Sequence, residues 1–391
     1  MEPNSRLKLE AISVTLAILL VSVPIHNDVE YALQSEAKSA DTLGGNSFID
    51  APTWRVNDRW VYSGELDVYD FIADSGVSTT VNTLTGTLDV QVESINLVDV
   101  GGIQTLAYTV AGTGDYRADN IQLEGQNGDV VVEMDTTSVI RVSDMAVISQ
   151  TATIDIEFDP AFGWICWLIS CDIASITASN EYWPPLERHD FPLSVGDTWV
   201  NNYTLNTTYS GSSSYVTIPQ STSDQVETTS TVVQAGYPGV SQSGCSVSYN
   251  VTATDVNGSL VGYGWHCDSM KNDVVTLNEV TLGLMARHEI DYSTLSPRPY
   301  VIDVEPMYPL APFDFISPVW VNVSDANGAP TANQLIEFRY DPTGEVQTIT
   351  TESNGSAFTT LNYGSQGDES LVDGEHGSHG IVARIVNTDH M

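Results

Sequence analysis

The chain has 391 residues and a mass of 42.3 kDa, which at roughly 150 residues per domain predicts two to four domains. Acidic residues outnumber basic ones 51 to 13, and the formal net charge is −38. Phosphate repels such a charge, so nucleic acid and anionic membrane surfaces are excluded as main partners. An acidic surface stays soluble in high salt, where screening removes its self-repulsion, and therefore indicates a halophilic or marine setting.

The N-terminus predicts export. Arg6 and Lys8 precede the almost wholly apolar stretch Ala11–Ile25, an order typical of a signal peptide. At 1.5 Å per residue this stretch spans about 22 Å, short of the ~30 Å bilayer core, so a cleaved signal is favoured over an uncleaved anchor. Residues 1–40 are interpreted as this signal or anchor plus a polar tether that continues to Asp50. The membrane is therefore expected to be contacted only through the N-terminal segment.

The chain contains four cysteines. In an exported protein they are expected to form disulfides, and of the three pairings we favour the local ones, Cys166–Cys171 and Cys245–Cys267. Asn257-Gly258 is a turn signal between two strand-like runs that contain Cys245 and Cys267. A regular hairpin around that turn places the latter two cysteines directly opposite each other, at a distance that a disulfide accepts.

From residue 51 onward the hydrophobic residues recur with a period of two. Leu88, Val90 and Val92 alternate with polar residues, and the same pattern returns at 154–158 and 319–323. Turn signals rich in glycine, asparagine and aspartate separate these runs at short intervals, as antiparallel sheets require. The chain is therefore predicted to be all-β.

An internal duplication divides the first three hundred residues. The pattern Val-x-Asp-x-Trp at 56–60 recurs at 195–199, a shift of 139 residues. Later matches pair Tyr108 with Tyr249 and Ile156 with Ile290. We interpret the pattern as two tandem related antiparallel β units, 51–160 and 190–297, each a curved sheet or half-barrel. A connector over 161–189, which contains tryptophans and cysteines, joins them.

Two resemblances refine this picture. The opening of the second unit, Phe-Pro-Leu-Ser-Val-Gly-Asp-Thr-Trp at 191–199, resembles the start of half-barrel domains of the lipoprotein-carrier type, which implies a concave sheet for an apolar ligand. Residues 300–391 resemble bacterial-type immunoglobulin-like repeats of invasin-like surface proteins. That resemblance rests on the turn Asp-Ala-Asn-Gly-Ala-Pro at 325–330, the turn beginning at Asn354, and the last strand, Ile381–Ile385. It implies an immunoglobulin-like β-sandwich after the two units.

Two groups of residues are candidates for modification or for contact with a partner. Six Asn-x-Ser/Thr sequons predict surface glycosylation sites if the host glycosylates, although some arise by chance in so polar a chain: Asn202, Asn206, Asn250, Asn257, Asn322 and Asn354. The aromatic residues Trp164, Trp167, Tyr182 and Trp183 gather in the connector. They form either an exposed patch that contacts a partner or a loop that seals the core between the units.

The candidate metal ligands are weak. Carboxylate-bearing turns place oxygen atoms two residues apart and suit calcium, although the same residues are typical of hairpin turns: Asp255 with Asn257, and Asp325 with Asn327. A weaker set, Glu375, His376 and His379, lies in a glycine-containing loop that would not preorganise a metal site. His288-Glu289 begins like a zinc-protease helix but lies in a strand pattern, so it is expected to be a surface pair. No cofactor is expected, with calcium as the alternative.

No nucleophile elbow, zinc-protease motif or phosphate-binding glycine loop occurs, so catalysis is not expected. We expect an exported cell-surface or secreted β protein with a structural, adhesion or binding role toward other surface proteins or glycans. One alternative is a carrier or sensor of apolar ligands in the half-barrel units. A second is a secreted hydrolase, because two suitably spaced carboxylates can come from anywhere in so acidic a chain.

Overall fold

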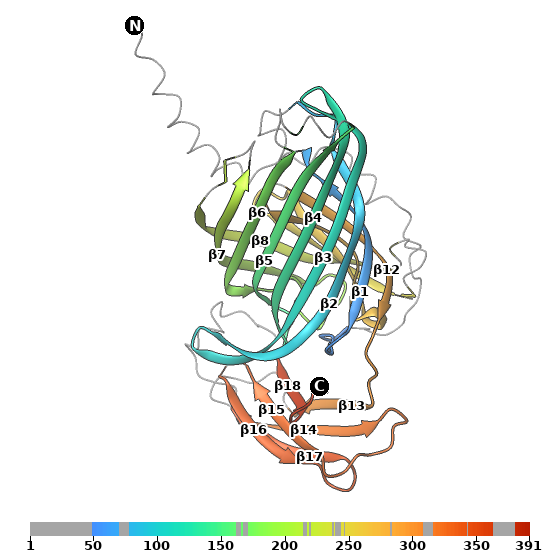
Figure 1. The fold of residues 1–391 in the computed structure, drawn as a ribbon. Coiled ribbons are helices and arrows are strands. Elements are labelled where there is room, and N and C mark those ends of the chain that lie inside the picture. The colour runs from blue at the N-terminus through green and yellow to red at the C-terminus, as the bar shows by residue number, and fades with distance from the viewer. Residues whose placement is uncertain are drawn as a thin grey trace.

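The structure is a computed structural model. It describes residues 49–69, 78–161, 166, 171–213, 217–218, 220–236, 238, 244–245, 247–281, 284–307, 316–341, 343–362 and 380–391. Its elements are β-strands, apart from the short 3₁₀ turn Asp268–Met270. The prediction of an all-β chain is confirmed, and Figure 1 shows these strands in two bodies of unequal size.

The larger body is one closed barrel of twelve antiparallel strands, in which each strand pairs with its neighbours in sequence and β1 pairs with β12. The strands are β1 (Arg59–Asp67), β2 (Thr83–Val100), β3 (Ile103–Leu123), β4 (Gln126–Arg141), β5 (Val147–Pro160), β6 (Asp172–Leu186), β7 (Thr198–Ser213), β8 (Ser221–Gly236), β9 (Ser248–Asp255), β10 (Leu260–Cys267), β11 (Asn272–Thr281) and β12 (Leu284–Thr294). Closure leaves the sheet without an unpaired edge, which removes the usual template for aggregation.

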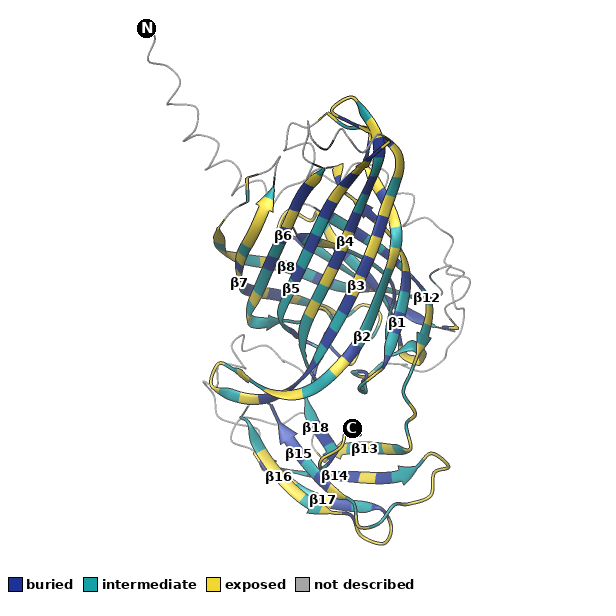
Figure 2. Ribbon diagram, viewed as in Figure 1, coloured by how far each residue is buried: buried dark blue, intermediate teal, exposed yellow. Residues whose placement is uncertain are grey.

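The alternating sequence pattern places apolar residues inside the barrel. In β4 the buried residues Val130, Val132 and Met134 alternate with the exposed residues Glu133 and Asp135, because successive side chains of a strand point to opposite faces. Figure 2 shows the same alternation of buried and exposed residues along the other long strands. Large side chains, among them Trp60 and Tyr108, are fully buried in this interior. The barrel thus encloses a packed core.

The predicted fold class of two half-barrel units followed by an immunoglobulin-like sandwich is wrong. The two units are halves of the same barrel, because β6 pairs with β7 and β12 pairs with β1. The segment 161–189, predicted as a connector, contains β6 and so supplies a strand of the barrel wall. Ile156 and Ile290 do not correspond, since they lie on β5 and on the last strand, β12. Each half by itself would leave two edge strands unpaired, which is a template for aggregation.

The smaller body follows the barrel and consists of two three-stranded sheets, with orders β13-β14-β17 and β16-β15-β18. The strands are β13 (Tyr300–Pro306), β14 (Ile316–Asp325), β15 (Leu335–Tyr340), β16 (Glu345–Thr350), β17 (Ser356–Asn362) and β18 (Ile381–Ile385). Their buried side chains, such as Val321 and Phe338, share one hydrophobic cluster. We call these six strands the C-terminal sheets.

The C-terminal sheets are docked on one end of the barrel. Arg339, which is 5% exposed, donates a hydrogen bond of 2.9 Å from Nη1 to the carbonyl oxygen of Gln104 on β3. Val382 packs into the same hydrophobic cluster as barrel residues. Arg55 binds Asp389 through two nitrogen atoms, at 2.7 and 3.3 Å. Apolar packing and directional polar bonds therefore hold the C-terminal sheets against this end of the barrel.

Candidate functional site in the barrel end

The site begins with the disulfide Cys245–Cys267, which joins the segment before β9 to the end of β10. Both predicted pairings are confirmed, since Cys166–Cys171 also forms. The predicted hairpin register is wrong, however. In the β9–β10 pair His266 lies opposite Tyr249, and the register shifts between Leu260 and Gly262. Cys245 lies before the first residue of β9, and the two Cα atoms are still only 6.1 Å apart.

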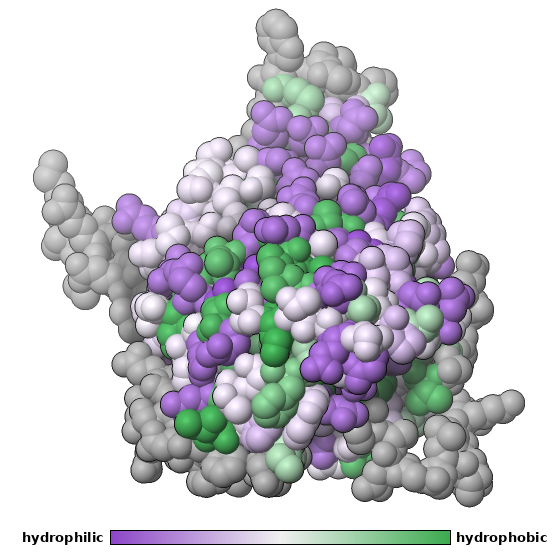
Figure 3. Space-filling model, turned by 90° about the horizontal axis from the view of Figure 1, so that it is seen from below, coloured by the Kyte–Doolittle hydropathy of each residue, from purple (hydrophilic) through white to green (hydrophobic). Residues whose placement is uncertain are grey.

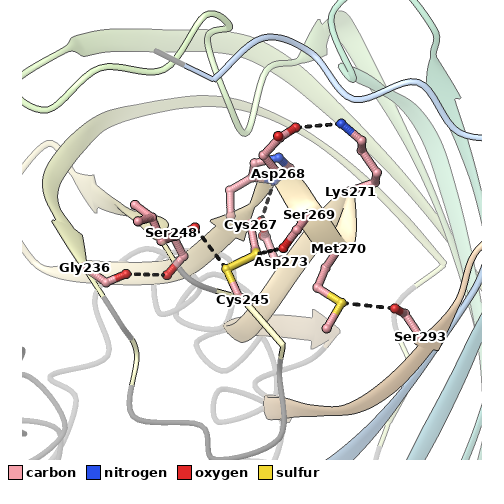
Figure 4. The surroundings of a disulfide bond; sticks show 12 residues. Gly236, Cys245, Ser248, Cys267, Asp268, Ser269, Met270, Lys271, Asp273 and Ser293 are labelled. Atoms are coloured by element: carbon pink, nitrogen blue, oxygen red, sulfur yellow. Dashed lines mark hydrogen bonds and ion pairs between the residues drawn. A yellow bond between two sulfur atoms is a disulfide. The ribbon is translucent and has the colours of Figure 1, made fainter. Parts of the chain in front are cut away.

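The turn between β10 and β11 follows directly after this disulfide, as Figure 4 shows. Three aromatic side chains from the start of the barrel hold the turn by its backbone carbonyls. Trp54 and Trp60 donate from their indole nitrogens to Lys271 and Met270, and the Tyr62 hydroxyl donates to Asp273. Buried aromatic donors of this kind need a polar partner. The start of the barrel, just before and within β1, therefore fixes the position of the turn between β10 and β11.

His189, His266 and Asp273 meet at this position. His266 lies on β10 directly opposite Asp273 on β11, and His189 comes from the connection between β6 and β7. The Asp273 Oδ1 atom is 3.2 Å from His266 Nδ1 and 3.2 Å from His189 Nε2. One potential ligand atom from each residue lies within 4.8 Å of the other two. We call these three residues the His-Asp cluster.

Burial and the interactions among the three residues together set the protonation of the cluster. His266 is 3% exposed, and the cost of desolvating a charge lowers the pKa of its imidazole despite the nearby carboxylate. Burial acts to raise the pKa of Asp273, but the two histidines outweigh it and hold that pKa well below its usual range. A neutral imidazole beside an ionised carboxylate is the state in which both groups act as metal ligands.

The surroundings of the cluster fix its side chains. The Phe191 ring stacks on His189 with ring centroids 5.6 Å apart and meets His266 edge-on at 5.2 Å. At Gly264, a Cβ atom would stand 2.4 Å from Asp273 Oδ2, so glycine leaves the space that the carboxylate occupies. The Trp199 indole donates to the carbonyl of Glu187, two residues before His189, at 3.0 Å. These contacts preorganise the cluster.

Another histidine, outside the His-Asp cluster, lies inside the barrel. His288, predicted as part of a surface pair, is 5% exposed on β12, and its Nε2 atom is 2.6 Å from the Tyr116 hydroxyl of β3. Burial lowers the pKa of His288 to about 4. The prediction was wrong because strand register alone decides which of two neighbouring residues faces inward. Gly64 on the paired strand β1 makes room, since a Cβ atom there would meet the imidazole at 2.5 Å.

The calcium candidates are parts of tight turns. Asp255 Oδ1 accepts backbone N–H groups of Asn257 and Ser259, at 2.9 and 2.8 Å. Asp325 Oδ1 accepts in the same way from Asn327 and from Ala329. These backbone bonds lower the pKa of both carboxyl groups. The geometry is that of a capped hairpin turn, and calcium binding stays a prediction. Glu375, His376 and His379 lie outside the described residues.

The sequons differ in exposure. Asn250 is 3% exposed on β9, so the folded chain does not present it to a glycosylating enzyme. The other five are exposed at the surface: Asn202, Asn206, Asn257, Asn322 and Asn354. Asn322 Oδ1 accepts a hydrogen bond from the Ser356 hydroxyl at 2.8 Å. Glycosylation at the five exposed positions stays a prediction.

The proposed aromatic patch is divided by the pleat of β6. The Tyr182 ring packs edge-on against Tyr203, with centroids 5.6 Å apart, and burial raises its pKa. Trp183 points to the opposite face of the sheet and is 42% exposed. Its ring lies against Gly101, where any Cβ atom would collide with it. Tyr182 and Trp183 therefore do not share one surface. Trp164 and Trp167 lie outside the described residues.

Sequence reasoning missed the His-Asp cluster. Its members are separated by 77 and 7 residues along the chain and match no ligand spacing. The one available signal lay in β10, where every second residue, Gly262, Gly264 and His266, faces inward. His266 also directly precedes a cysteine of the predicted hairpin. His189 could not be found this way, because it lies in a connection between strands.

Comparisons with known proteins add little. No protein-family model matches the chain, and none of the curated proteins matches it. Among solved structures, a crystal structure of a β-barrel-like protein of the domain of unknown function DUF1849 from Brucella abortus is similar, with 10% identity and a TM-score of 0.31. That match covers 63% of this chain and 100% of the other. A similarity of this size carries no argument. In the described residues no helix has the length and apolar character needed to cross a lipid bilayer.

Proposed function

We propose that this chain is an exported protein of the cell surface or the extracellular space, with a structural, adhesion or binding role. The observation that carries the proposal is the pair of disulfides Cys166–Cys171 and Cys245–Cys267, because such bonds persist in oxidising compartments. The apolar segment Ala11–Ile25, which lies outside the described residues, supports export by its sequence.

The C-terminal sheets offer a surface for a partner. Trp320 on β14 and Phe358 on β17 pair with ring centroids 5.1 Å apart, and Phe358 is 44% exposed. Ile316 at the start of β14 is 61% exposed. Figure 3 views the molecule from this end and shows hydrophobic side chains between hydrophilic ones. Exposed aromatic rings suit contacts with another surface protein or a glycan.

The outer face of the barrel supports a high-salt setting. Asp115, Glu133 and Asp155 lie opposite one another on β3, β4 and β5, so three like charges follow each other across neighbouring strands. Opposed like charges destabilise a sheet, and dissolved salt screens their repulsion. The unfolding temperature should therefore rise as NaCl is increased from about 0.1 to 2 M. At 1 M the Debye length is only about 3 Å, so the repulsion between these carboxylates is largely screened.

The alternatives have less support. A carrier of apolar ligands needs an open interior, whereas side chains such as Tyr108 and Tyr116 fill the space between the strands. A glycoside hydrolase needs two carboxyl groups about 5–10 Å apart, one of them shielded enough from solvent to stay protonated. The groove of about 470 Å³ beside β5 and β6 gathers Asp155, Glu157 and Asp172, but the last two are exposed.

Localisation in the native host tests the proposal. Intact cells and culture medium are probed with an antibody to the chain, before and after treatment with a protease that cannot enter cells. We expect the protein in the medium, or on the cells and lost on treatment, while a cytosolic marker resists. Recovery of the full-length, protease-resistant chain from the cytosol would overturn the proposal.

A further inference from the structure

We propose that the His-Asp cluster, His189, His266 and Asp273, is a binding site for one divalent transition-metal ion of the zinc class. Two imidazoles and one carboxylate are a donor set that suits zinc, whereas calcium prefers oxygen ligands alone. Three protein ligands leave a fourth position for water. The inference does not depend on where the protein is located.

The two distances from Asp273 fit ligands of a shared ion. Ligand atoms about 2.0–2.1 Å from a tetrahedral zinc ion are about 3.3 Å apart. Asp273 Oδ1 is 3.2 Å from a ring nitrogen of each histidine. Direct charge-assisted hydrogen bonds are shorter, at about 2.7–2.9 Å. The spacing of 3.2 Å is close to that of ligands around a shared ion and lies at the long end of the range for a direct hydrogen bond.

Polar atoms at the site lack partners. His266 is 3% exposed, and its Nε2 atom has no hydrogen-bond partner among the described residues. His189 Nε2 lies close to the carboxylate, but it too makes no hydrogen bond with the geometry that such a bond requires. Buried polar atoms without partners are rare in folded proteins and require an explanation. A bound ion supplies one for His189 Nε2, which faces Asp273, but not for His266 Nε2, because the Nδ1 atom of that ring would bind the ion.

Binding would exchange protons for the ion. In the metal-free protein the Nδ1–H group of His266 donates to Asp273, and a metal ion takes the place of that proton. The site would connect three separate segments: the β6–β7 connection through His189, β10 through His266 and β11 through Asp273. Cys267, next to His266, ties this group to the segment before β9. The ion would thus hold the barrel end together.

The experiment uses full-length oxidised protein, freed of metal with a chelator and titrated calorimetrically with ZnCl₂. We expect one zinc per chain and a higher unfolding temperature. His189→Gln and Asp273→Asn should each weaken binding by at least roughly 100-fold, more than loss of an outer-shell partner does. The variant His376→Gln/His379→Gln removes two histidines that lie close together in the sequence but outside the cluster, and it should bind zinc like the wild type.

Two results would overturn the proposal: absence of zinc binding by the folded wild type, or binding that survives in both cluster variants. Circular dichroism first establishes that each variant is folded. If a variant does not fold, Co²⁺ bound to the wild type gives an independent readout. Intense visible absorption typical of a four-coordinate ion supports the site, and the weak spectrum of a six-coordinate ion contradicts it.

Discussion

The two halves of the barrel open with the same turn. In the first half Asp58 Oδ2 accepts the N–H of Arg55 at 2.8 Å, and in the second Asp197 Oδ2 accepts the N–H of Ser194 at 2.7 Å. Each turn has a residue with positive φ before the aspartate, Asn57 at 72° and Gly196 at 98°. Asparagine and glycine tolerate this conformation best, so the local sequence suffices to build the turn twice.

The surroundings of the two turns differ. Asp58 is completely buried and also binds Ser296 and Arg298, whereas Asp197 is partly exposed. Trp60 is fully buried and holds the turn before Asp273, while the partly exposed Trp199 holds the segment before His189. The contribution of a duplicated local motif to stability therefore depends on the residues that the rest of the chain packs against it.

The largest expected difference concerns the tryptophans. Trp60→Ala should destabilise the protein by about 5 kcal/mol, because it leaves a cavity in the core and an unpaired carbonyl. Trp199→Ala should cost about 2 kcal/mol, because that ring is already partly exposed. Denaturant unfolding monitored by circular dichroism measures both. Equal losses would contradict the unequal roles of the two copies.

The aspartates should differ next. Asp58→Ala should cost about 3–4 kcal/mol, because the change removes the carboxylate that pairs with the Arg298 guanidinium and leaves the part-buried N–H groups of Arg55 and Ser296 without their acceptor. Asp197→Ala removes one local turn bond and should cost about 1 kcal/mol. Thermal unfolding of both variants, compared with wild type, gives the ratio of the two stability losses. A loss at Asp197 as large as that at Asp58 would show that the turn itself dominates.

The disulfides allow a third comparison, since one lies in each half. Removing Cys245–Cys267, with a sequence separation of 22, should cost about 3 kcal/mol in the chain-entropy model. Removing Cys166–Cys171, with a separation of 5, should cost about 2 kcal/mol. Double Cys→Ala variants unfolded in denaturant measure the two losses. The reverse order would point to native-state packing rather than loop length as the source of stability.

Histidine-dependent acid sensitivity should arise in the second half of the barrel alone, because the sequence has no histidine between His26 and His189. The pKa of His288 is about 4 in the folded protein and ~6.5 unfolded, so below pH 6.5 the unfolded state binds more protons. Stability should fall as the pH drops from 6.5 to 4, by about 2 kcal/mol at pH 5.

His288→Gln should flatten this acid limb when the unfolding temperature is measured at intervals of pH. The buried His266 contributes a residual slope of the same sign, because its pKa is also lowered. His390→Gln, at the chain's C-terminal end, serves as the matched control and should leave most of the limb in place. An unchanged limb in His288→Gln would mean that other groups cause the acid sensitivity.

The sequence by itself determined the local structure of this protein. Alternation of apolar and polar residues predicted the strands, since side chains of a strand alternate between faces. Asp58 and Asp197 predicted the repeated turn, and the four cysteines predicted their local pairing, because each of these features depends on residues near in sequence or on compartment.

The tertiary structure alone decided the rest. Closure of twelve strands into one barrel depends on the pairing of β1 with β12 and of β6 with β7, and no local pattern encodes such pairing. Register irregularities beside Gly262 and His266 decided which residues face inward. The His-Asp cluster exists only because the closed barrel brings His189 beside β10 and β11, and contacts between distant segments are set by the packing of the whole chain.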